Sequence, residues 1–217
     1  MADESGELQD QLRRLAAGDQ QALAELFARY RDRLRRMVKL RLDRRLQGRV
    51  DASDVLQDAY LDVAQRAAEY AASPTLPVFL WLRFLTGMKL HALHRHHLGT
   101  KARAAGREVP LHGALPRASS VSLAARLLGR LTTPSQAAVR AELWARVREA
   151  LNGLEALDRE VLALRHFEQL TNAETAQVLG LSETAASNRY VRALQRLTAA
   201  LQGTPGPGGA APAEGAP

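Results

Sequence analysis

The amino-acid sequence predicts an all-α protein, built as two small helical domains joined by a flexible linker. Helix-forming residues such as Ala, Leu, Arg and Glu are abundant in the 217-residue chain, and apolar residues recur at the three- and four-residue spacing of amphipathic helices. Residues 98–140 are instead interrupted by Gly, Pro and Ser, which is typical of a linker, with a single helical patch predicted at Ser122–Leu131. We therefore expect domains at residues 1–97 and 141–201, followed by an unfolded tail at 202–217.

The charge and composition of the chain limit its chemistry and its partners. A formal net charge of +7 and an isoelectric point near 10.5 favour a polyanionic partner, nucleic acid before membrane. The absence of cysteine excludes disulfides, thiol catalysis and cysteine metal sites. No apolar run approaches the ~18 residues of a membrane span, and the acidic N-terminus lacks the zones of a signal peptide. We therefore expect a cytoplasmic protein.

Three amphipathic helices are predicted before residue 71. Leucines at positions 8, 12 and 15 mark a first helix that ends near residue 18. A second, longer helix is crowded with arginine on one face, and its apolar stripe consists of Leu23, Leu26, Phe27, Tyr30, Leu34, Met37 and Val38. After a connection at residues 48–50, Asp51 or Ser53 can cap a third helix from Asp54 to about Tyr70.

The third predicted helix has an acidic face in an otherwise basic protein. Asp54, Gln57, Asp58 and Asp62 follow one another at i, i+3, i+4 and i+8, which places them on one surface. Such local acidity indicates a distinct, basic protein partner, although a solvated helix face is the ordinary alternative.

A basic and aromatic zone follows the loop at residues 71–77. The fourth predicted helix runs from Val78 to about His97, and no acidic residue occurs between positions 71 and 107. Basic groups beside aromatic rings suit melted nucleic acid, whose bases stack on rings; the alternative is that the rings are core, which we prefer for Phe79 and Phe84. The spacing of His91 and His94 suits a metal, but no carboxylate accompanies them, so we predict phosphate contact and no metal site.

The segment from Leu170 to Leu201 predicts a helix-turn-helix. Thr171 and Glu174 have the spacing of a capping box, Gly180 can end a short helix, and Ser182 can cap a longer one. The second helix of such a motif can enter the major groove of DNA. Its polar face carries Thr184, Ser187, Asn188, Arg189, Arg192 and Arg196. We interpret the segment as a DNA reader; the alternative is an ordinary helix pair with solvated arginines.

These motifs together resemble the sigma-70 family of bacterial RNA polymerase sigma factors, in its extracytoplasmic-function (ECF) group. Residues 54–60, Asp-Val-Leu-Gln-Asp-Ala-Tyr, are similar to the family's polymerase-binding helix in region 2. Trp81-Leu82 after a short loop resembles the helix that reads and melts the −10 element, and residues 170–197 are similar to region 4, which reads the −35 element. The resemblance covers about residues 8–97 and 143–201.

The resemblance implies a protein without enzymatic activity or cofactor, which binds core RNA polymerase and directs promoter recognition and transcription initiation. Core polymerase and promoter DNA would be its partners. An anti-sigma factor or another regulator is a further possible partner. The residues implied to face polymerase are Asp54, Gln57 and Asp58. Those implied to lie along the −10 strand are Tyr70, Trp81, Arg83, Lys89, His94 and Arg95. Those implied to contact the −35 element are Thr184, Ser187, Asn188, Arg189 and Arg192.

Two other classes of protein are alternatives to this one. A helix-turn-helix regulator that binds operators as a dimer, without polymerase, explains residues 170–201 equally well. It does not explain the acidic helix or the basic and aromatic zone in a different domain. An enzyme has little support, because no nucleophile with a nearby base is evident. The linker composition also predicts that the free protein cannot hold both promoter elements until polymerase spreads its two domains.

Overall fold

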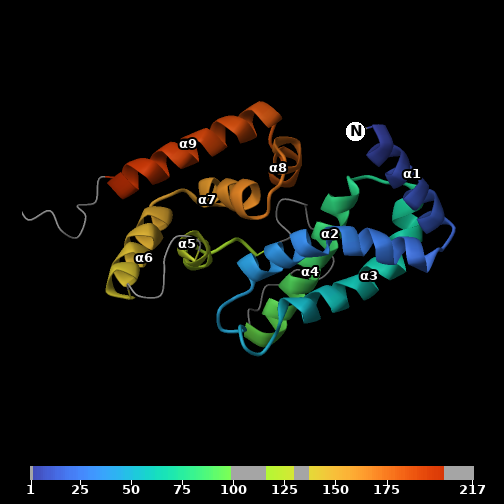
Figure 1. Cartoon of the computed structure of the whole chain (residues 1–217), viewed down its shortest axis with the longest axis horizontal. Helices are drawn as coiled ribbons and strands as arrows, with labels where there is room; N and C mark the ends of the chain where they lie inside the picture. The colour runs from blue at the N-terminus through green and yellow to red at the C-terminus, as the bar shows by residue number, and fades with distance from the viewer. Residues whose placement is uncertain (1, 99–115, 130–136, 203–217) are drawn as a thin grey trace, which may run out of the picture.

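A computed structural model describes residues 2–98, 116–129 and 137–202, and the elements in these ranges are all helices (Figure 1). The N-terminal half consists of α1 (Ala2–Ala16), α2 (Gln20–Arg41), α3 (Ala52–Ala72) and α4 (Val78–Leu98). The C-terminal half consists of α5 (Ser120–Leu128), α6 (Ala137–Asn152), α7 (Ala156–Leu162), the π-helix η1 (Ala163–Phe167), α8 (Asn172–Leu179) and α9 (Glu183–Gln202). The predicted all-α fold is confirmed.

Acidic caps begin the two long helices of the N-terminal half. The Asp19 carboxylate accepts the N–H of Gln21 at 2.8 Å at the start of α2. Asp51 caps α3, and the Asp54 carboxylate accepts the N–H of Asp51 at 3.0 Å, which completes a capping box. Asp54 therefore stabilises the start of α3. The position of Asp54 on the acidic face did not indicate this structural role.

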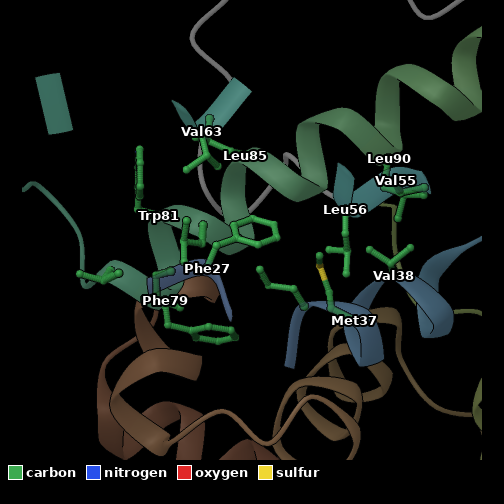
Figure 2. Close-up of a cluster of buried hydrophobic side chains, with 14 of the residues drawn as sticks. Phe27, Met37, Val38, Val55, Leu56, Val63, Phe79, Trp81, Leu85 and Leu90 are labelled. Atoms are coloured by element: carbon green, nitrogen blue, oxygen red, sulfur yellow. The ribbon is translucent and has the colours of Figure 1, made fainter. Parts of the chain in front are cut away.

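The first core lies between α1, α2, α3 and α4. The apolar stripe of α2 packs against α3 and α4, as its periodicity predicts, and Figure 2 shows Met37 and Val38 of α2 directed towards Val55 and Leu56 of α3. Phe27 meets Tyr60 edge to face, with ring centroids 5.2 Å apart. Burial of these side chains is the main stabilising contribution to this half.

The second core is formed by α5, α6, α7 and α9, and it includes part of the predicted linker. Residues 99–115 and 130–136 of that linker, and the tail from residue 203, lie outside the described residues. The remainder contains α5, whose Leu123 and Leu128 are buried in the same cluster as Val147 and Leu151 of the α6 segment. Ser119 caps α5 by accepting the N–H of Ser122 at 3.1 Å. Residues 116–129 are therefore folded against the C-terminal half.

The two halves pack directly against each other. Leu164, Leu170 and Val178 come from the C-terminal half but are buried in the first core, and Leu40 of α2 is buried in the second. Figure 1 shows the C-terminal helices lying along one side of the α1–α4 bundle. The described parts of the two halves therefore meet at a packed seam.

Candidate DNA-binding and protein-binding surfaces

The helix-turn-helix forms as predicted, with each local signal in place. The Thr171 hydroxyl accepts the N–H of Glu174 at 3.1 Å, and the Glu174 carboxylate accepts the N–H of Thr171 at 2.7 Å. Gly180 ends α8 in the left-handed conformation, with φ of 65°, which glycine adopts without the clash of a Cβ atom. The Ser182 hydroxyl then accepts the N–H of Ala185 at 3.2 Å at the start of α9.

The polar face of α9 is open to solvent. Ala186 and Ala193 are buried on its inner side, whereas the predicted readers Thr184, Ser187, Asn188 and Arg192 are all exposed. Sequence reasoning missed Val191, which lies on this same outer face and is 48% exposed. The helical spacing could have revealed this exposure, because Val191 falls outside the apolar stripe of α9.

Arg189 is held towards α7 rather than pointing freely outward. Its Nη1 lies 2.7 Å from Asp158 Oδ1, and Arg196 Nη1 lies 2.7 Å from Asp158 Oδ2. The hydrogen bond to Asp158 raises the pKa of Arg189, against a smaller effect of burial. The Asp158 side chain is only 2% exposed, so this carboxylate anchors α9 to α7. In this structure Nη1 of Arg189 is therefore bound to Asp158, and the Arg189 side chain is 26% exposed.

The acidic face of α3 is exposed, and it surrounds an apolar residue that the sequence analysis missed. Asp54, Gln57 and Asp58 all reach solvent, as the helical spacing predicts. Leu61 lies one turn beyond Asp58 and is 59% exposed, the most exposed large hydrophobic residue in the part of the chain that the structure describes. The exposed face of α3 therefore combines carboxylates with one exposed leucine.

Three of the six predicted −10 residues, Tyr70, Trp81 and Arg83, are buried in this structure. Tyr70 stacks on Trp81 with ring centroids 4.0 Å apart, and its hydroxyl donates to the Leu76 carbonyl at 2.7 Å. Burial raises the pKa of Tyr70 to about 12, with a smaller effect of Tyr30. Arg83 is 1% exposed, because it projects into the seam and not towards solvent.

The other three lie on the second half of α4, nearer to solvent. The Lys89 ammonium is 3.4 Å from Asp62 of α3. His94 accepts the N–H of Asp43 at 3.2 Å, and burial lowers its pKa, against the attraction of Asp43. The Nε2 atom of His94 therefore already accepts a hydrogen bond from the backbone of Asp43. Arg95 is exposed. The structure thus brings Tyr70 and Trp81 together and leaves the other predicted residues dispersed along α4.

A buried ion-pair cluster joins the two halves, and the sequence did not indicate it. Arg41 of α2 places Nε 2.7 Å from Glu168 Oε1, and Arg83 of α4 places Nε 2.8 Å from Glu168 Oε2. Arg41 also reaches Glu160 at 2.5 Å and the Pro116 carbonyl at 2.8 Å. Burial raises the pKa of Glu168, but the two guanidiniums outweigh it and leave the pKa below its ordinary value. Burial likewise disfavours the charge on Arg41, and the two carboxylates outweigh it and raise its pKa.

No group of three metal-ligating side chains occurs among residues 2–98, 116–129 and 137–202. Within the same ranges, no helix has both the length and the apolar composition that a membrane span requires.

The fold and its surfaces define a class of protein: a helical DNA-binding protein with a helix-turn-helix in one half and an acidic, leucine-containing face in the other. A family model described as "Sigma-70, region 4" matches residues 144–197. The ECF RNA polymerase sigma factor SigD of Mycobacterium tuberculosis is 30% identical over 181 residues, which are 83% of this chain and 77% of SigD. The RNA polymerase sigma factor NccH of Alcaligenes xylosoxydans is 37% identical over 67 residues, 31% of this chain and 36% of NccH.

A solved structure agrees with these relatives. CnrH, in complex with the cytosolic domain of CnrY, matches with a TM-score of 0.52 and 25% identity, over 89% of this chain and 96% of CnrH. The chain belongs to the ECF group of RNA polymerase sigma factors. It is a sigma factor that directs transcription initiation, as the sequence predicts.

Proposed function

We propose that this sigma factor binds core RNA polymerase through the exposed face of α3 and reads the −35 element through the exposed face of α9. The observation that carries the proposal is the pairing of these two surfaces, one acidic and one polar and basic, on separate halves of one chain. An operator-binding regulator needs only the second of them.

The α3 surface offers one apolar side chain surrounded by polar groups. Leu61 supplies an exposed apolar anchor, and Gln57 and Asp58 supply polar groups around it. A few central residues carry most of the binding energy of an interface, whereas charges at the rim select the partner and speed association. We therefore assign the main affinity to Leu61 and the preference for a basic partner to Asp58.

The α9 surface has the side chains that direct readout requires. Asn188 can bond bidentately to adenine, Val191 can contact a thymine methyl group, and Arg192 can reach guanine or phosphate. Thr184 and Ser187 lie on the same exposed face, towards the N-terminal end that enters the groove. Arg189 joins them after it leaves Asp158.

Two functional units follow from this assignment. Residues 1–97 hold polymerase and the −10 strand, and the C-terminal unit, which here includes α5, holds the −35 element. The chain supplies binding and no catalysis, and it acts in the cytoplasm with polymerase. Because CnrH is bound by the cytosolic domain of CnrY in its solved complex, we also infer that a regulatory protein, such as an anti-sigma factor, binds this chain.

Interferometry with core polymerase tests the first surface. Leu61→Ala and Asp58→Lys should each weaken binding, Leu61→Ala by about tenfold, which corresponds to a loss of ~1.4 kcal/mol. Glu142→Lys, an equal charge change on the exposed side of α6, is the matched control. Asp54 is left intact because its carboxylate caps α3. If neither variant differs from the control, α3 does not bind polymerase.

Transcription from a promoter library randomised at both elements tests the second surface. Holoenzyme selects its own promoters from such a library, so no target has to be known beforehand. Asn188→Ala should relax selection at one −35 position, whereas replacing a phosphate contact should weaken all sequences alike. Selection of the same −35 sequence by holoenzyme with the Asn188 and Arg192 variants would exclude α9 as the reader.

A further inference from the structure

A basic hollow lies where the end of α2 and the turn that follows it meet α5 and α6. One part of the basic hollow has a volume of about 400 Å³ and the adjoining part about 320 Å³, and Arg44, Val121 and Ser122 line both parts. One wall consists of residues 39–47 with His94, and the other consists of residues 116–126 with Trp144. The walls therefore come from the two halves of the chain, and each part has the volume of a small-molecule site.

Positive charge dominates the lining of the basic hollow. The basic side chains that line it and reach solvent are those of Lys39, Arg44, Arg117 and Arg126. One carboxylate, that of Asp43, lies among the described lining residues, and Arg45 binds it with Nε 3.0 Å from Oδ1. The hydrogen bond from Arg45 lowers the pKa of Asp43 to about 2, so this negative charge is already paired. Arg41 also lines the basic hollow, but Glu160 and Glu168 pair with it.

Two of these cations face each other from opposite walls without a partner. The guanidinium groups of Arg44 and Arg117 are exposed and make no hydrogen bond or ion pair with residues 2–98, 116–129 or 137–202. A single exposed arginine is solvated at little cost, but several cations around one hollow raise its positive potential. An anion held between the two walls would remove the repulsion between their charges.

The start of α5 opens onto the same hollow. Ser119, Val121 and Ser122 line it, and the Ser119 hydroxyl accepts the Ser122 N–H at 3.1 Å. The two serine hydroxyl oxygens lie 2.9 Å apart. The first N–H groups of a helix have no acceptor inside the helix, and their partial positive charge favours an anion. The helix start therefore adds hydrogen-bond donors to the charge of the arginines.

We propose that the basic hollow binds the di- or triphosphate group of a small molecule, with Arg44 and Arg117 as its main cations and the start of α5 as a further donor. Guanidinium binds phosphate oxygens through planar pairs of N–H groups, which suits arginines on both sides of one ligand. Free polyphosphate and nucleoside phosphates share this chemistry, and Trp144 offers an indole beside the base of a nucleotide. Because the walls belong to different halves, a bound anion stabilises their packing over their separation.

A DNA strand is the alternative occupant, because His94 of the predicted −10 residues lines the edge of the basic hollow. His94 Nε2 accepts the Asp43 N–H, and burial lowers the pKa of His94, so this nitrogen has no N–H to donate to a phosphate. The lining cations converge on a hollow instead of following one helix face. That arrangement suits a compact anion better than a long backbone, and the site adds a small-molecule ligand to the proposed function.

Calorimetric titration of the full-length chain with sodium tripolyphosphate and with GTP tests the proposal. The variant Arg44→Gln/Arg117→Gln removes one guanidinium from each wall. The control Arg13→Gln/Arg66→Gln removes two exposed guanidiniums from α1 and α3, so both variants lose the same net charge. We expect the wall variant to bind both probes about tenfold more weakly than the control, because two charge-assisted contacts are lost. Equal affinities of the two variants, or no binding by the parent chain, overturn the proposal.

Two comparisons decide the type of ligand. Tighter binding of GTP than of tripolyphosphate supports a nucleotide site, whereas the reverse order supports a site for free polyphosphate. Oligonucleotides, one single-stranded and one duplex, are added as competitors at the same total phosphate concentration as the probe. Neither should displace the probe. Displacement by either oligonucleotide overturns the proposal, because the basic hollow would then be part of the path of DNA.

A protection test keeps the proposal falsifiable if the wall variant does not fold. The chain contains no cysteine, so Ala125→Cys introduces a single thiol at an exposed residue that lines the basic hollow. Ala68→Cys, at an exposed residue of α3, is the control. Saturating tripolyphosphate should slow alkylation by iodoacetamide severalfold at Ala125→Cys and leave the rate at Ala68→Cys unchanged. An equal effect at both positions overturns the proposal. Neither experiment involves polymerase, so its failure and the failure of the proposed function are distinguishable.

Discussion

Removal of the Glu168 carboxylate should open the seam between the two halves. Glu168 is 1% exposed and bridges Arg41 at 2.7 Å and Arg83 at 2.8 Å. In Glu168→Ala, Arg41 keeps Glu160 and the Pro116 carbonyl. Arg83 keeps no carboxylate, since Glu168 is its ion-pair partner within the described residues. The substitution therefore leaves one fully buried cation uncompensated.

The expected cost follows from this burial. Removing one partner of a buried ion pair destabilises a protein by about 3–5 kcal/mol, a large part of the ~5–15 kcal/mol that a domain has in total. The chain can escape this cost by separating its halves, which returns Arg83 to water and leaves each core folded. We therefore expect the effect to appear mainly as expansion. Small-angle scattering should show a radius of gyration well above the ~17 Å typical of a compact chain of this length.

Two matched variants separate this mechanism from a general loss of stability. Glu174→Gln breaks the pair with Arg33, whose side chains are 17% and 25% exposed, so it should cost less than ~1 kcal/mol and leave the chain compact. Arg83→Met in the Glu168→Ala background removes the stranded cation and should restore compaction. If Glu168→Ala unfolds in urea within ~0.5 kcal/mol of the parent and keeps the same radius of gyration, the ion pairs do not hold the seam.

Two further predictions concern a helix cap and acid sensitivity. Thr171→Ala removes the hydroxyl that accepts the Glu174 N–H, so it should destabilise the helix-turn-helix by ~1 kcal/mol in thermal denaturation, whereas Thr171→Ser should retain the cap. The pKa of Glu168 is lowered below its ordinary 4.5, so its contribution to stability is present above that pH and is lost as the pH falls towards the folded-state pKa; scattering at pH 6 and pH 3.5 should show expansion only in acid. Burial lowers the pKa of His94 from its ordinary 6.5, so stability should already begin to fall below about that pH, and His94→Gln should remove this part of the pH dependence in urea titrations; an unchanged profile would contradict the assignment of His94 as a neutral acceptor for Asp43.

Local signals in the sequence were sufficient for the helices and for the polar residues of the two exposed surfaces. The capping box at Thr171, the left-handed Gly180 and the acidic spacing from Asp54 to Asp58 each involve residues within one or two turns of each other. Interactions of that range are decided by backbone geometry, and tertiary packing leaves them unchanged. The short range of these signals also explains the result at α5. The sequence predicts a helical patch there, because helix signals are local. It does not predict the burial of α5 against α6, because that contact is between distant segments.

The partners of the buried charges were decided only by the tertiary structure. Arg41 and Arg83 read as members of basic stretches, yet they meet Glu168 across 127 and 85 residues of chain. Arg83 stands in the apolar run of residues 78–85 and Arg95 stands among histidines, but neither setting identifies Glu168 as the partner of Arg83. Which arginine is buried depends on the face of α4 that the C-terminal half covers, and that choice follows from the packing of Leu164, Leu170 and Val178 into the first core. Because packing of apolar surface selects which helix faces meet, charge pairing at the seam is a consequence of the assembled fold.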